Sequence, residues 1–205
     1  AILGGVTVDL SAADQVVTMD GGTNAAVQTG FENVDVRAFA NFGAVITGSD
    51  GANIITGTVL ADRIDAGKGN DTIQVALTND ANNDQINGGA GTDTFTILAG
   101  NYVPAADGNL IAVETITSAV AGTITLGNQT EGFTITAGAG AQVINGGQGS
   151  DAIALGAAGD IDTIIMTGNG TTSSDTVSGF IVALGEDELE LDLSDLNARS
   201  GTMQQ

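Results

Sequence analysis

A nine-residue pattern recurs in this chain and leaves few folds open to it. The pattern is Gly-Gly-x-Gly-x-Asp-x-aliphatic-x, and full copies occupy residues 66–74, 88–96 and 146–154, with Ala66 in the first position of the first copy. Glycine turns the backbone through conformations that residues with a Cβ resist, so these positions predict tight loops. The aliphatic residue two places after the aspartate predicts a very short strand that points into a core. Three full copies therefore indicate short strands joined by tight glycine loops.

The spacing of the partial copies predicts how these loops stack. Nine residues make one loop and one short strand, which is half a coil, so each loop stacks on the second loop along the chain. The step from Asp71 to Asp84 is 13 residues, which predicts a four-residue bulge around residues 78–82. One rim is expected to carry Asn53, Asp71 and Asp93, and the opposite rim Asp62 and Asp84. The predicted core is a stack of Ile55, Ile64, Ile73, Ile86 and Phe95.

The charge and composition exclude several classes of function. Twenty-five acidic and four basic residues give a net charge of -21, which would repel the phosphates of a nucleic acid. No apolar run reaches the roughly 18 to 20 residues that span a bilayer. Cysteine and histidine are absent, and there is no Gly-x-Ser-x-Gly motif, so we expect no catalysis. The chain opens without Met and without a signal peptide, so we expect it to be a piece of a longer protein.

Aspartates in stacked glycine loops suit one class of metal ion. A cation between successive loops on one rim would meet two aspartate side chains and several loop carbonyls. Calcium takes six to eight such oxygen ligands, so the pattern predicts several bound Ca²⁺ ions.

A second, weaker unit repeats the first with an offset of 80 residues. Asn53 then falls opposite Phe133, and Asp62 opposite Gln142, so the acidic ligands are not preserved. Asp162 and Asp175 follow at irregular spacing. We therefore expect the second unit to bind less calcium and to depend more on apolar stacking.

The fold predicted from these patterns is all-β, a parallel β-roll or β-solenoid with two roll units and a C-terminal capping strand. The expected division is a lead-in β segment (1–45), a first calcium-binding roll (46–99), a β-rich connecting segment that continues the sheet (100–136), a second roll (137–178) and the cap (179–205).

The repeats resemble those of the repeats-in-toxin (RTX) family of secreted bacterial proteins. The lead-in Phe31-Glu-Asn-Val34 is similar to segments of surface-layer and adhesin-type members, and the stretch from Asp175 to Phe180 is similar to the region that closes such rolls. The resemblance implies a right-handed roll, type I export and an extracellular or cell-surface location. Motif and resemblance together predict these calcium-binding residues: Asp50, Asn53, Asp62, Gly67, Gly69, Asp71, Asp84, Gly88, Gly89, Gly91, Asp93, Gly146, Gly147, Gly149, Asp151, Asp162 and Asp175.

Two functions are compatible with this resemblance. The first is a structural module of a bacterial surface layer, filament or adhesin, which folds on calcium outside the cell and associates with itself in a lattice or filament. The alternative is the C-terminal export and folding module of a type I-secreted protease or lipase. A cell-surface polysaccharide is a further candidate partner, although six Phe and one Tyr offer few stacking platforms.

Overall fold

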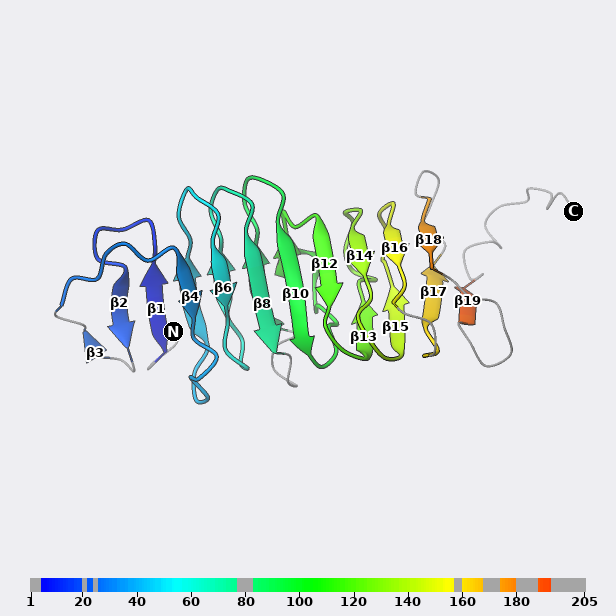
Figure 1. Cartoon of the computed structure of the whole chain (residues 1–205), viewed down its shortest axis with the longest axis horizontal. Coiled ribbons are helices and arrows are strands. Elements are labelled where there is room, and N and C mark those ends of the chain that lie inside the picture. The colour runs from blue at the N-terminus through cyan, green and yellow to red at the C-terminus, as the bar shows by residue number, and fades with distance from the viewer. Residues whose placement is uncertain are drawn as a thin grey trace, which may run out of the picture.

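The chain winds into a β-solenoid whose short strands stack side by side along one axis (Figure 1). The computed structural model describes residues 5–19, 22–23, 26–76, 83–156, 160–167, 174–179 and 188–192. Within them there is no α-helix, and Asp107–Asn109 forms a 3-10 turn (η2). Accordingly, no helix of the described part is long and apolar enough to cross a membrane.

One wall of the solenoid is an eight-stranded sheet in which every neighbouring pair is parallel. Successive strands come from successive coils, with the order β18-β16-β14-β12-β10-β8-β6-β4. Their bounds are β4 Asn33–Asp35, β6 Ile54–Thr56, β8 Thr72–Ala76, β10 Thr94–Ala99, β12 Thr115–Ser118, β14 Thr134–Thr136, β16 Ala152–Ala154 and β18 Thr176–Ser178.

The opposite wall consists of two sheets in succession. The first has the order β11-β9-β7-β5-β1-β2-β3, and its N-terminal end is an antiparallel meander through β1, β2 and β3. The second has the order β13-β15-β17-β19 and is parallel throughout. The bounds are β1 Val6–Asp9, β2 Val16–Met19, β3 Gly22–Thr23, β5 Ala44–Thr47, β7 Arg63–Asp65, β9 Gln85–Asn87, β11 Leu110–Ile111, β13 Gly122–Thr125, β15 Gln142–Asn145, β17 Thr163–Thr167 and β19 Glu188–Asp192.

A thin core of aliphatic side chains lies between the walls. In the eight-stranded sheet Ile55, Ile73 and Phe95 occupy paired register positions and are fully buried. Ile64 and Ile86 do the same in the opposite wall. The predicted core stack is therefore confirmed, and it continues past the first roll through Ile116, Ile135 and Ile153.

The segments outside the full repeats belong to the same solenoid. The connecting segment continues the sheet as expected, because β12 pairs with β10 on one side and with β14 on the other. The lead-in strand β1 pairs in parallel with β5, and the predicted C-terminal strand is present as β19, paired with β17. The bulge expected around residues 78–82 lies outside the described residues.

The core stack generates a test with a matched control. Ile55 is fully buried, whereas its neighbour Ile54 is 48% exposed on the outer face. We expect Ile55→Ala to lower the free energy of unfolding in saturating calcium by about 2–5 kcal/mol, because it removes packed methylenes and leaves a cavity. Ile54→Ala should change it by less than about 0.5 kcal/mol. Equal effects in denaturant-unfolding curves would contradict the assignment of the core.

Candidate metal centre

Acidic side chains on one rim of the solenoid form a ladder of hydrogen bonds from coil to coil. The backbone N–H of Asn53 donates to Asp71 Oδ1, that of Asp71 to Asp93 Oδ1 and that of Asp93 to Glu114 Oε2, each at 2.7 Å. The predicted grouping of Asn53, Asp71 and Asp93 on one rim is confirmed. Asp71 and Asp93 are almost completely buried.

The opposite rim carries the same arrangement. The N–H of Ala44 donates to Asp62 Oδ1 at 2.6 Å, and the N–H of Asp62 donates to Asp84 Oδ1 at 2.8 Å. Asp62 also accepts from Thr58, whose N–H reaches Oδ2 at 2.7 Å and whose hydroxyl reaches Oδ1 at 2.8 Å. Both oxygens of Asp62 therefore have donors from the protein.

The second half of the chain repeats the ladders, which there begin on Phe133 and Gln142. Phe133 N–H donates to Asp151 Oδ1 at 2.8 Å, and Asp151 N–H donates to Asp175 Oδ1 at 3.0 Å. On the other rim Gln142 N–H donates to Asp162 Oδ1 at 2.8 Å. The predicted equivalence of Phe133 with Asn53, and of Gln142 with Asp62, holds in the structure.

Four of the buried carboxylates have one oxygen that finds no partner. These are the Oδ2 atoms of Asp71, Asp84, Asp93 and Asp151. A buried anionic oxygen without a hydrogen bond or a cation is strongly unfavourable. Each therefore marks a place where a cation would satisfy the carboxylate.

Glycines at the first position of the loops lie beside these oxygens. A Cβ at Gly88 would lie 2.8 Å from Asp93 Oδ2 and would collide with the carbonyl oxygen of Ala112. A Cβ at Gly146 would likewise strike Asp151 Oδ2. The space that a side chain would fill is thus lined by carboxylate and carbonyl oxygens, the ligand type that calcium prefers.

Positive backbone φ angles allow successive loops to stack closely. Gly67 and Gly89 have φ of 99° and 95°, and the Ala90 N–H donates to the Gly67 carbonyl at 2.9 Å. A Cβ at Gly89 would collide with that carbonyl oxygen, so the second motif position needs glycine for space as well as for conformation. Three other predicted loop glycines, Gly69, Gly91 and Gly147, also have positive φ. Gly149 instead shares the close backbone approach, because it packs against the Glu131 carbonyl.

The donor set fits calcium bound mainly through the backbone. Among the described residues there is no group of three or more acidic, histidine or cysteine side chains that could hold a metal. An ion at a rim would therefore take one or two carboxylates and complete its six to eight ligands with loop carbonyls. A zinc site of Cys and His side chains has no counterpart, because the sequence contains neither.

Burial raises the pKa values of the ladder carboxylates. The pKa of Asp84 rises to about 8 and that of Asp151 to about 6, chiefly because burial disfavours the charged form. Burial is also the main cause of the raised pKa values of Asp62, Asp71 and Asp93; the negative charge of Asp93 adds to the effect at Asp71. In the absence of a cation, some of these side chains are therefore protonated, neutral carboxyl groups.

Two predicted ligands differ from expectation. The carboxylate of Asp50 is exposed and pairs with Lys68 Nζ at 2.8 Å, so the structure does not bring it into the ladder. A surface lysine one coil away offers it a partner that the loop pattern did not reveal. Asn53 lies on the rim, but its Nδ2 donates to the Glu32 carbonyl at 2.6 Å and its Oδ1 accepts from Ser49 N–H at 2.7 Å. Its side chain is satisfied without an ion.

One acidic member of the ladder was missed from the sequence. Glu114 accepts the N–H of Asp93 and thereby takes the aspartate position of its coil. The signal was available, because Glu114 precedes the buried Ile116 by two residues, as Asp93 precedes Phe95.

Comparison with known families matches the same segments. The model of the RTX calcium-binding nonapeptide repeat matches residues 47–80, 80–103 and 134–162, which contain the glycine loops and all of the ladder aspartates described above except Asp175. Comparison with curated proteins gave no match, and neither did comparison with solved structures.

The Asp93 carboxylate has two roles, a hydrogen bond through Oδ1 and proposed ion binding through the unpartnered Oδ2. One substitution tells them apart. Asp93→Asn keeps an Oδ1 that accepts the Asp71 N–H but removes the negative charge. We expect calcium affinity at this rim to fall by about tenfold or more, with the folded spectrum retained in saturating calcium. Isothermal titration calorimetry measures this, and Asp65→Asn, which alters an exposed carboxylate on β7, is the control. Unchanged affinity in Asp93→Asn would contradict a ligand role.

The raised pKa values predict an unusual pH dependence without calcium. A carboxyl group whose pKa is raised by folding stabilises the fold below its unfolded pKa, near 3.8, and loses that contribution as pH rises through the folded value. Between about pH 4 and pH 8 the calcium-free fold should therefore become less stable as pH rises. Thermal melts in chelator at pH 5 and pH 8 test the sign, and a higher melting temperature at pH 8 would contradict it.

Proposed function

Because the chain is an RTX calcium-binding β-roll protein, we propose that it is a calcium-folded structural module of an extracellular bacterial layer, filament or adhesin. The observation that carries this proposal is the set of buried, orphaned carboxylate oxygens on stacked glycine loops. These atoms make the solenoid dependent on a cation that is scarce inside cells and abundant outside them.

Calcium acts on the two main obstacles to folding. Stacked carboxylates repel one another across neighbouring coils, and the glycine-rich loops lose much conformational entropy when they are ordered. An ion that bridges two loops removes the repulsion and joins the coils. Binding to the folded form alone stabilises it by about 2.7 kcal/mol per site at a hundredfold excess over the dissociation constant.

The proposed location follows from this dependence. We infer that low cytosolic calcium keeps the chain unfolded and fit for type I export, and that millimolar calcium outside the cell folds it. The extracellular position also suits a chain without cysteine, whose stability comes from bound ions in place of disulfides.

A scaffold role without catalysis is part of the proposal. The chain contains no histidine or cysteine nucleophile system, and the ladder carboxylates serve as hydrogen-bond acceptors and candidate ion ligands. The regular walls of the solenoid instead offer long surfaces that suit contacts between copies.

Circular dichroism tests the calcium dependence directly. We expect the full chain to lose most of its β signal in chelator at pH 8 and to regain it with millimolar calcium. Magnesium at the same concentration should not restore it, because Mg²⁺ demands a tighter octahedral geometry and gives up its water reluctantly. Identical spectra in chelator and in calcium would refute the folding switch.

A further inference from the structure

The outer face of the eight-stranded sheet carries two straight rows of threonine. On β10, β12 and β14 the outward positions are Thr94, Thr115 and Thr134 in one row and Thr96, Thr117 and Thr136 in the other. We call these six residues the threonine face. Their alternation with buried side chains shows that they point away from the core.

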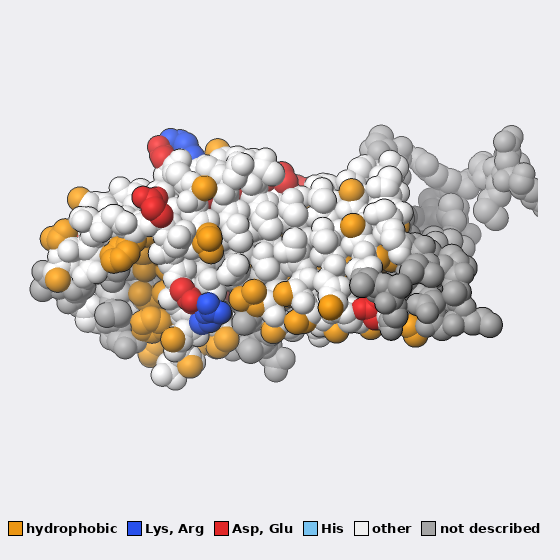
Figure 2. All heavy atoms as spheres, viewed as in Figure 1, with side chains coloured by type: hydrophobic (Ala, Val, Ile, Leu, Met, Phe, Trp, Pro, Cys, Tyr) orange, Lys and Arg blue, Asp and Glu red, His pale blue; other side chains and the backbone are white. Residues whose placement is uncertain are grey.

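The threonine face lies in an uncharged region of a strongly acidic molecule. The outward positions of β8 (Thr72, Gln74) and β16 (Ala152, Ala154) extend it with uncharged side chains. Figure 2 shows this region as a pale surface over β8 to β14, with the acidic and basic side chains at its margins. In a chain with a net charge of -21, such an area requires an explanation.

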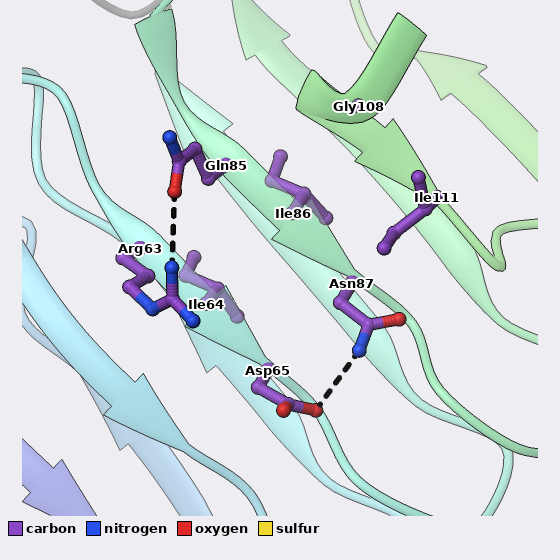
Figure 3. Close-up of a pocket in the computed structure, with 8 residues that line it drawn as sticks. All are labelled: Arg63, Ile64, Asp65, Gln85, Ile86, Asn87, Gly108 and Ile111. Carbon is purple, nitrogen blue, oxygen red and sulfur yellow. Dashed lines mark hydrogen bonds between the residues drawn. The ribbon is translucent and has the colours of Figure 1, made fainter.

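The opposite wall carries charged side chains nearer the N-terminus, on β7. There Arg63 donates to Gln85 at 3.1 Å, and Asp65 accepts from Asn87 at 3.3 Å (Figure 3). At the level of β12 and β14 the outward residues of β13 and β15, Thr123, Thr125 and Val143, are uncharged as well, so a variant on each wall is needed to tell the two walls apart.

The rows are in strict register, which makes the face complementary to itself. Thr94 pairs with Thr115 and Thr115 with Thr134, without a register shift, and the Thr96 and Thr117 hydroxyls lie 2.9 Å apart. Strands in a sheet repeat about every 4.8 Å, so two copies of this face present the same repeat to each other. Small side chains on both sides also let two sheets approach closely.

We propose that the threonine face is the surface through which a second copy of this chain docks, face to face. Two copies with a net charge of -21 each repel one another, and a face without charged side chains is where they can approach. This inference rests on the proposed structural role and names the contact that serves it.

The size of the face sets the strength of the contact. The five strands from β8 to β16 span roughly 20 Å along the axis, and two residues along a strand span about 7 Å. The contact is therefore well below the roughly 800 Å² per partner of a stable dimer. It is a weak contact that becomes effective when many modules are held together, as in a layer or filament.

A single introduced cysteine can detect so weak a contact, because the chain has none of its own. Thr117 lies on the central strand, close to any two-fold axis between the faces. In calcium, we expect Thr117→Cys to form a disulfide-linked dimer at least about tenfold faster than Val143→Cys. Val143 is the matched control, since it is a half-buried outward residue on β15 in the opposite wall.

A second experiment tests whether charge repulsion limits the association of copies. Light scattering of the full chain in calcium should rise with protein concentration and with added salt, because salt screens the repulsion between copies. Thr117→Asp should abolish this rise, whereas Val143→Asp should preserve it, and both variants should keep the calcium-dependent circular dichroism of the fold.

The outcomes distinguish the surface from the function. If the wild type associates and Thr117→Asp associates equally, or if Thr117→Cys crosslinks no faster than Val143→Cys, the threonine face is the wrong surface and the structural role stands. If the wild type folds with calcium but neither crosslinks nor scatters more at any concentration, docking of a second copy is refuted, whereas the proposed function is refuted only by a loss of the calcium-dependent folding. Wild-type monomers retained on chitin or cellulose through this face would also overturn docking of a second copy.

Discussion

The solenoid depends on carboxylates whose two oxygens have different roles. In Asp71, Asp93, Asp84 and Asp151 one oxygen accepts a backbone N–H from the preceding coil and the other is buried without a partner. The first bond aligns the coils, and the second oxygen makes that alignment unfavourable unless a cation or a proton is present. Structure and ion dependence thus come from the same side chain.

Much of the fold and of the rims was predictable because the nonapeptide pattern is strictly local. Gly67 and Asp71 lie four residues apart in one loop, and the nine-residue step determines which loops stack. Contacts between side chains of neighbouring coils were less predictable. The exposed Asp50 meets Lys68 from the next coil, and Glu114 enters the ladder although it is not an aspartate. Such pairings depend on the stacked geometry, which the irregular spacing of the later coils conceals in the sequence.

Two of the ladders begin on residues with amide side chains, which bond to the preceding coil. Asn53 begins one ladder and Gln142 another, and each side chain donates to a carbonyl of the preceding coil, that of Glu32 or that of Val120. An amide nitrogen supplies by hydrogen bonding part of what an ion supplies to aspartate. The second half also relies on Phe133, buried at the start of its ladder. Solenoid coils therefore continue past the ion-binding repeats without a break in the sheet.

Acidic and uncharged side chains lie on different parts of the solenoid and have different roles. Acidic groups that bind and align lie at the rims, buried among glycine loops, and the wall between the rims needs only side chains that suit a strand. Threonine satisfies that need without charge, because its β-branched side chain favours the strand and its hydroxyl can bond along the row, as Thr96 and Thr117 do. A wall freed from ion binding in this way is available for the docking of a second copy that we propose, and calcium would control that docking only by controlling whether the wall exists.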